Sequence, residues 1–200
     1  DDGYTMTITQ SNVAIASSSN AGLYYGVQSL FQLMKQDTST YKKGKSDTLY
    51  KTLPCAEIQD LPAYTFRGFG LDVSSHFFTV EVIKEYIDAM AMLKLNQLHL
   101  KLADKKVCRL PLTNLPKSTL SDSVRIQNAE GYYSSYTKDD IAGLVKYARE
   151  HFINIIPEFD FSYLLVNDSA QNQKKSIDEI LAMFPAKFLH IGQTNYLSKE

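Results

Sequence analysis

The chain carries the stretch Phe66-Arg67-Gly68-Phe69-Gly70-Leu71-Asp72-Val73. A short run of apolar and glycine residues of this kind is typical of a buried strand. A helix is expected to begin at Thr79, because Glu81 then lies in its first turn, where negative charge is favourable. The inward face of that helix is predicted from apolar residues at helical spacing: Ile83, Ile87, Met90 and Leu93.

The same alternation of strand and helix continues to the end of the chain. Further strands are predicted at residues 97–102, 153–159 and 187–191. Helices are predicted from two capping-box patterns, one at Thr137 and Asp140 and one at Ser176 and Glu179. Strands that alternate with helices form parallel βαβ units.

Four such units make half of a TIM-type (β/α)8 barrel, which needs about 250 residues when complete. The sequence therefore predicts an α/β fold, a partial barrel of about four βα units, over residues 53–200. The chain is expected to stop near the middle of that barrel. The other half is lost or lies on another chain, or the strands form an open sheet instead.

Residues 1–52 are predicted to be part of a small α+β domain. Tyr4–Ile8 and Val13–Ile15 alternate polar and apolar residues, which predicts a hairpin. One apolar stripe at helical spacing follows, made of Leu23, Val27, Leu30, Phe31 and Met34. The polar stretch 36–51 is interpreted as an exposed loop. Leu53–Pro62, which contains two prolines, is interpreted as an inter-domain linker.

Composition narrows the classes of partner. The formal net charge is -1, from 21 basic and 22 acidic residues, so charge gives no reason to expect a nucleic-acid partner. No apolar stretch is long enough to predict a membrane span. Cys55 and Cys108 allow one disulfide or two buried free thiols. The chain begins with Asp1, as a processed or trimmed chain would, and the sequon at Asn167 favours a secretory route, extracellular or lysosome-like.

Six segments in order resemble glycoside hydrolase family 20, the β-N-acetylhexosaminidase family. The first matches a helix of that family's small α+β domain, and the others match barrel strands and a helix entry. They are residues 21–30, 66–78, 95–100, 131–141, 155–160 and 188–192. The resemblance implies a partial and degenerate family member, with the end of the small domain followed by the first half of the barrel.

The resemblance also implies which residues catalyse. In this family the acetamido oxygen of the substrate attacks the anomeric carbon, a Glu is the general acid, and the preceding Asp orients the acetamido group. Both follow the fourth strand as His-Ile-Gly-Gly-Asp-Glu, whereas this chain has Thr194 and Asn195 in those positions. Asn is not an acid, and loss of a general acid costs about 10²- to 10⁴-fold in rate.

Four residues remain candidates for substrate binding: Arg67, Asp104, Glu158 and Asp160. Arg67 matches the family arginine that binds sugar hydroxyls, or else it forms an ion pair with Asp72 or Glu158. Glu158 and Asp160 share a strand face, so they are either a replacement acid pair or part of an inherited polar network at the barrel mouth.

No cofactor and no metal are predicted. His99 and His190 lie within apolar strands and are interpreted as interior histidines, because no metal-ligand spacing connects them. The family's usual Asp pair, Gln and Trp after the second strand is reduced to Asp104, which Lys105, Lys106, Val107 and Cys108 follow. The family's Met-Pro-Gly-His after the third strand is replaced, so that histidine is absent as well.

Three functions remain in competition. The first is a non-catalytic, structural or partner-binding protein on a hexosaminidase scaffold. The second is a fragment or subunit of an active glycoside hydrolase that removes terminal N-acetylhexosamine, with a protein partner covering the open barrel edge. The third is a module that binds N-acetylhexosamine glycans through Arg67 without turnover. Trimming of the sequence explains a missing half but not the change to Thr194 and Asn195.

Overall fold

The structure is a computed structural model that describes residues 2–36, 51–103, 108–112, 135–160 and 169–192. The chain forms two compact units. The first contains Asp1–Thr65 and Ala91–Lys94, and the second contains Phe66–Met90 and Leu95–Glu200. Among the candidate residues, Asp104, Thr194 and Asn195 lie outside the described ranges, as does most of the polar stretch 36–51.

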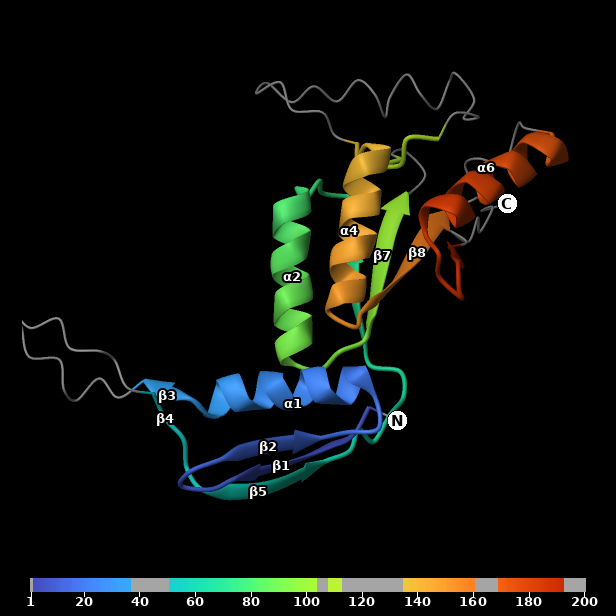
Figure 1. The fold of residues 1–200 in the computed structure, drawn as a ribbon. Coiled ribbons are helices and arrows are strands. Elements are labelled where there is room, and N and C mark those ends of the chain that lie inside the picture. Colours follow the sequence, from blue (N-terminus) through green and yellow to red (C-terminus); the bar gives the residue numbers. More distant parts are fainter. Residues whose placement is uncertain (1, 37–50, 104–107, 113–134, 161–168, 193–200) are drawn as a thin grey trace, which may run out of the picture. The chain divides into compact units, whose positions relative to one another are not determined.

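The first unit contains a three-stranded antiparallel sheet of order β2-β1-β5 (Figure 1). Its strands are β1 (Tyr4–Ile8), β2 (Val13–Ala16) and β5 (Ala56–Asp60), while β3 (Lys35–Gln36) and β4 (Lys51–Thr52) form a separate short pair. The predicted hairpin is confirmed by the pairing of β1 with β2. The interpretation of Leu53–Pro62 as a linker is wrong, because β5 lies within it and pairs along the whole of β1.

Helix α1 (Asn20–Leu33) lies against this sheet through two glycines and a tyrosine. Ser19 caps it by accepting a hydrogen bond from the Gly22 N–H. The buried residues of α1 are Gly22, Tyr25 and Gly26, whereas three members of the predicted apolar stripe, Leu23, Val27 and Phe31, are exposed. Leu30, another member of the stripe, packs against the core cluster of this unit together with Tyr25, so the stripe is only in part the buried face. Glycine allows the close approach of backbones beside Tyr25.

Gly22 and Gly143 provide a matched pair of helix glycines with opposite expected effects. A Cβ at Gly22 would lie 2.4 Å from the Gly3 carbonyl oxygen, while a Cβ at Gly143 would meet nothing within 4 Å. We expect Gly22→Ala to destabilise the first unit by about 1–3 kcal/mol and Gly143→Ala to stabilise the second by about 0.5–1 kcal/mol. Urea unfolding of both variants measures these changes, and stabilisation by Gly22→Ala would contradict the close approach.

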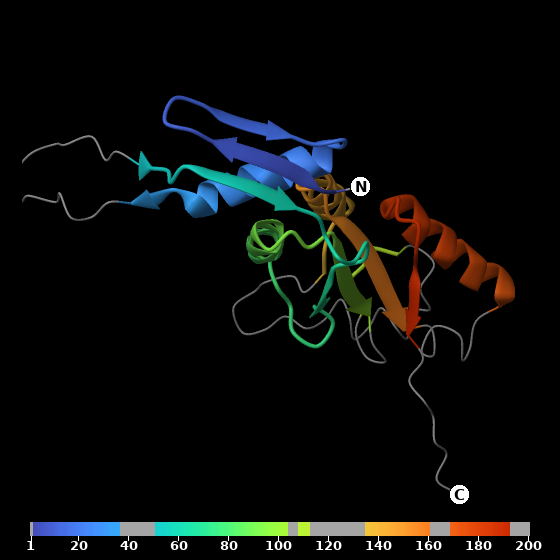
Figure 2. The same cartoon turned by 90° about the horizontal axis from the view of Figure 1, so that it is seen from below.

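The second unit contains a four-stranded parallel sheet of order β6-β7-β8-β9. The strands are β6 (Gly68–Asp72), β7 (Gln97–Ala103), β8 (Asn154–Asp160) and β9 (His190–Gly192), and the helices are α2 (Val80–Met92), α4 (Lys138–Glu150) and α6 (Ala170–Met183). Figure 2 shows these helices along one side of the strands. The four predicted strands and the partial TIM-type barrel are confirmed, with a described helix after each of the first three strands. The fourth strand begins at His190 and not at the predicted Lys187. No helix in the described ranges is both long and apolar enough to cross a membrane.

The two faces of this sheet differ sharply. On β7, Leu98, Leu100 and Leu102 are fully buried on the helix-covered face, while Gln97, His99 and Lys101 alternate with them and are half-buried. The helices contribute the other side of the core with residues that are at most 3% exposed: Ile83, Ile87, Met90, Ile141, Leu144, Ala148, Ile180 and Phe184. The core therefore lies between sheet and helices, and the opposite face carries polar side chains.

The helix starts test the two predicted capping boxes. The box of α4 is confirmed, with Thr137 and Asp140 each bonded to the other's backbone N–H. The box at Ser176 is wrong, because α6 begins at Ala170 after its N-cap Ser169, and Ser176 is buried within the helix. The first turns of α6 are polar, from Gln171 to Lys175, so they lack the apolar period that would have revealed them.

Candidate functional site

Polar side chains gather on the face of the parallel sheet that the described helices do not cover. The register places Asp72 of β6 beside Lys101 of β7, Lys101 beside Glu158 of β8, and Glu158 beside His190 of β9. Every second residue of a strand points to the same face, so His99 shares this face with Lys101. The carboxyl ends of parallel barrel strands are where TIM-type enzymes place their active sites. This face is the candidate site.

Asp72 closes the carboxyl end of β6. Its Oδ1 accepts hydrogen bonds from the Ser74 hydroxyl at 2.6 Å, the Ser74 N–H at 2.9 Å and the Ser75 N–H at 3.2 Å, and its Oδ2 lies 3.4 Å from Lys101 Nζ. Partial burial raises the pKa of Asp72, but these hydrogen bonds and the Lys101 charge outweigh it and leave the pKa below its ordinary value. Asp72 is therefore an anion that organises the turn after β6.

Because the folded pKa of Asp72 is lowered, Asp72 stabilises the fold above its unfolded pKa, about 3.9. This contribution is lost as pH falls through the folded value, since the unfolded chain binds the proton first. We expect the free energy of unfolding to decrease with falling pH below about 4, and to decrease less steeply in Asp72→Asn. Urea titrations at several acidic pH values measure both slopes, and equal slopes in the two proteins would contradict this role.

Three ionisable side chains from three strands converge at the centre of the face. His99 Nε2 lies 2.7 Å from Glu158 Oε2, and His190 Nδ1 lies 3.1 Å from the same oxygen. The two imidazole nitrogens lie 2.7 Å apart. The interpretation of both histidines as interior residues is wrong for His190, whose side chain is 51% exposed. The structure brings His99 on β7 close to His190 on β9. The spacing of the two residues in the sequence could not show this proximity.

The other predicted residues are placed differently. Glu158 is part of the polar network, and its contacts with the two histidines match the network alternative better than the acid-pair alternative. Asp160 ends β8 opposite Gly192. Arg67 immediately precedes β6, and its backbone N–H donates to Asn96 Oδ1. Its role in sugar binding stays a prediction.

Arg109 is a buried residue that sequence reasoning missed. It is 4% exposed, and its Nε and Nη2 donate to the carbonyl oxygens of Val73 and Ser74 at 3.1 and 3.0 Å. The sequence feature that could have revealed it is a lone arginine within the otherwise apolar segment 107–112. A charge in such a segment is buried, and a buried charge must be paired or hydrogen-bonded. Arg109 fixes the segment after β6 against the segment after β7.

Aromatic residues complete this support. The Phe77 ring contacts both the Arg109 guanidinium, at 5.5 Å, and the Tyr136 ring, at 5.0 Å. The Tyr136 hydroxyl donates to the Phe78 carbonyl oxygen at 2.6 Å. Burial raises the pKa of Tyr136, so this hydroxyl stays protonated and remains a donor. The loop after β6 is thus held from two sides.

The two cysteines are both free, with Cys55 exposed and Cys108 buried. Burial raises the pKa of the Cys108 thiol to about 12, although the Leu110 backbone and Arg109 oppose the rise. Because the thiolate is the reactive form, we expect a disulfide-exchange reagent to modify one thiol in the native chain and two in denaturant. Cys55→Ser should remove the fast thiol. Two fast thiols, or none, would contradict this environment.

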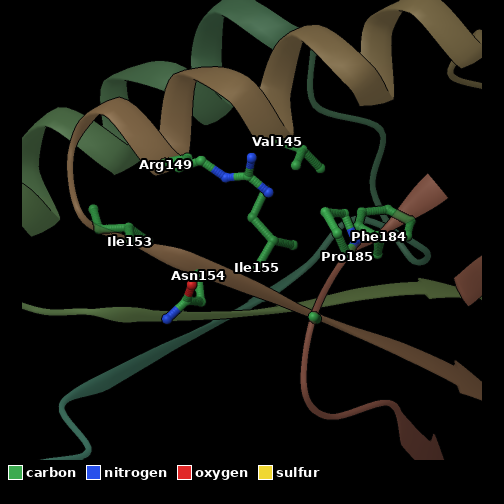
Figure 3. Close-up of a pocket in the computed structure, with 8 residues that line it drawn as sticks. Val145, Arg149, Ile153, Asn154, Ile155, Phe184 and Pro185 are labelled. Atoms are coloured by element: carbon green, nitrogen blue, oxygen red, sulfur yellow. The ribbon is translucent and has the colours of Figure 1, made fainter. Parts of the chain in front are cut away.

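A small cavity lies elsewhere, at the amino end of β8 (Figure 3). Its volume is about 20 Å³, which is room for about one water molecule. Its lining comes from α4, the start of β8 and the segment after α6: Val145, Arg149, Ile153, Asn154, Ile155, Phe184, Pro185 and Ala186. Its size and its place at the amino end indicate a packing gap and not a substrate pocket.

Comparisons with known proteins agree with this architecture. Residues 64–162 match the sequence profile "Glycosyl hydrolase family 20, catalytic domain", and residues 1–61 match "Glycosyl hydrolase family 20, domain 2". A β-hexosaminidase of Porphyromonas gingivalis is 36% identical over 161 residues, which are 80% of this chain and 20% of that protein. One of Akkermansia muciniphila is 34% identical over 162 residues, 80% of this chain and 31% of that protein.

Solved structures extend the likeness to nearly the whole chain. A chitobiase of Flavobacterium johnsoniae is 27% identical with a TM-score of 0.77, and covers 96% of this chain and 32% of its own. A family 20 β-N-acetylhexosaminidase of Streptomyces coelicolor gives the same identity and TM-score, with 96% and 45% coverage. The chain spans between a fifth and a third of the curated relatives described above. On these matches in sequence and fold, the chain belongs to glycoside hydrolase family 20.

Proposed function

We propose that the chain is a hexosaminidase-like protein that does not hydrolyse glycosides by itself and acts as a structural or partner-binding scaffold. The observation that carries the proposal is the sequence His190-Ile191-Gly192-Gln193-Thr194-Asn195. Thr194 and Asn195 stand where the family places its Asp and Glu. Neither side chain can supply a proton to the leaving oxygen of a glycoside at neutral pH.

The polar face supports this proposal. Glu158 is the acidic residue at its centre, and its side chain is 15% exposed. Two imidazoles already contact its carboxylate, so using it as a general acid would require breaking those contacts. A general acid must also be within about 3 Å of the oxygen it protonates. Glu158 is thus better suited to hold the strands in register than to replace the missing acid.

The partner-binding part of the proposal rests on apolar side chains of the last helix and strand. Leu181 on α6 is 44% exposed, Phe188 before β9 is 64% exposed, and Ile191 within β9 is 55% exposed. The described strands leave β6 and β9 at the two edges of the sheet. Edges and apolar side chains of this kind are covered in stable proteins. We propose a protein partner at the β9 edge and a secretory setting.

A hydrolysis assay joined to a mass measurement tests the proposal. The purified chain is assayed with 4-nitrophenyl N-acetyl-β-glucosaminide, and its mass in solution is measured by light scattering. We expect no turnover above that of the Asp160→Asn variant. Turnover that Asp160→Asn abolishes would contradict a non-catalytic role. A larger assembly that is active would support the second candidate, in which this chain contributes to a glycoside hydrolase such as its named relatives.

The glycan-binding alternative is tested separately. Arg67, on which this alternative depends, stands immediately before β6. Under the scaffold proposal, titration with N-acetylglucosamine and N-acetylgalactosamine, followed by NMR, is expected to show no saturable binding. Saturable binding lost in Arg67→Ala would favour the glycan-binding module instead.

A further inference from the structure

Three metal-ligating atoms meet on the polar face of the sheet. They are His99 Nε2 from β7, Glu158 Oε2 from β8 and His190 Nδ1 from β9, and all lie within 4.8 Å of one another. The pairwise distances are 2.7, 3.1 and 2.7 Å. Three adjacent strands of one parallel sheet deliver them, so their backbone positions are fixed by the strand register.

Hydrogen bonding alone cannot satisfy all three contacts while Glu158 is ionised. A ring nitrogen carries either a proton or a lone pair. If both nitrogens carry protons, two donors face each other across 2.7 Å. If only one does, the carboxylate faces the lone pair of the other nitrogen. A cation between the three atoms removes this conflict, because each atom then presents a lone pair to it.

The geometry is close to that of a bound ion. Zinc binds histidine nitrogen and carboxylate oxygen at about 2.0–2.2 Å in tetrahedral sites, so neighbouring ligand atoms lie roughly 3.3–3.4 Å apart. The three observed distances would each have to open by less than about 0.8 Å. Side-chain rotations within one rotamer well provide movements of that size, and the strands need not move.

The surroundings leave room for the ion and a further ligand. Lys101 is a neighbouring cation on the same face, and its ammonium is paired with Asp72 at 3.4 Å. Gly70 is the residue opposite His99 in the register, and a Cβ there would meet nothing within 4 Å. As far as the described residues go, a fourth coordination position is therefore open to water or to an anionic group.

We propose that His99, Glu158 and His190 bind one divalent transition-metal ion of the zinc class on this face. Two imidazoles with one carboxylate and an open position form a ligand set used for zinc, and also for ferrous iron. Zinc binds such nitrogen and oxygen ligands more tightly than ferrous iron does. The sequence predicted no metal, because the two histidines are 91 residues apart. The site does not depend on glycosidase activity.

The test is zinc binding by the metal-free full chain. Cys55 is an exposed thiol that could itself bind zinc. The parent chain and every variant in this experiment therefore carry Cys55→Ser. Equilibrium dialysis with zinc is expected to give one ion per chain. Cobalt substitution is expected to give the visible absorption of a four-coordinate nitrogen and oxygen site. His99→Ala and His190→Ala should each weaken zinc binding at least tenfold.

Two further variants keep the result decisive. Glu158→Gln preserves the side-chain volume and should also weaken binding at least tenfold, since the amide lacks the negative charge. His76→Ala removes an exposed histidine outside the cluster and should leave the affinity within twofold. Circular dichroism confirms that each variant is folded. Absence of zinc binding by the folded parent chain, or equal binding by His99→Ala and His190→Ala, overturns the proposal.

Discussion

Leu100→Ala is expected to lower the free energy of unfolding of the barrel unit by about 2–5 kcal/mol. Leu100 is fully buried on β7, one of the two inner strands of the four-stranded sheet. Strands β6 and β8 hold it in register on both sides, so its surroundings cannot collapse into the space that three lost carbons leave. Urea unfolding followed by circular dichroism measures the change.

Gln97→Ala is the matched control for Leu100→Ala. Gln97 lies on the same strand but points to the opposite, half-buried face. Its replacement should change the free energy of unfolding by no more than about 0.5 kcal/mol. Similar effects at both positions would mean that the two faces of the sheet are not distinguished as the structure shows.

Arg109→Ala is expected to lower the free energy of unfolding by about 2–6 kcal/mol. The carbonyl groups of Val73 and Ser74, residues that are 0% and 1% exposed, would each lose a donor, and a buried unsatisfied carbonyl costs about 1–3 kcal/mol. Phe77 would also lose the guanidinium that lies over its ring. Arg109→Lys should have an intermediate effect, because one ammonium cannot reproduce the two-pronged donation.

Arg149→Ala provides the control for this charge removal. Arg149 lies in the last turn of α4 and is exposed, so the main loss is its interaction with the helix dipole, about 0.3–1 kcal/mol. Urea unfolding of the three arginine variants ranks them. An Arg109→Ala protein as stable as Arg149→Ala would show that the buried guanidinium does not hold the segment after β6.

The barrel strands could be predicted from the sequence because the residue pattern that produces them is local. Alternation of apolar and polar residues determines which face of β7 is buried, and Leu98 to Leu102 show that alternation directly. The resemblance identified the family from short motifs on those same strands. Starts of helices were predicted where a capping residue precedes an apolar period, as at Thr137, and were missed where polar turns come first, as in α6.

The contacts of the candidate site could not be predicted in the same way. His99 and His190 meet only because β7, β8 and β9 are neighbours in one sheet, a property of the whole fold and not of either segment. Arg109 is similar, since its partners Val73 and Ser74 are 36 and 35 residues away. The apolar stripe on α1 was only partly correct. Leu30 packs against the core, but the glycines that pack most closely add no hydrophobic signal to the sequence.

The strand order of the two sheets has a consequence for how the chain is assembled during synthesis. In the parallel sheet each new strand joins the edge of the strand made before it, so order in space follows order in time. In the first unit β1 is the central strand although it is synthesised first. It can pair fully only after β5 has been synthesised, because Tyr4 pairs with Asp60. Closing the long loop between β1 and β5 costs conformational entropy before the strand pairing can stabilise it. The hairpin of β1 and β2 can therefore form early, while the first sheet is completed only when residue 60 has emerged.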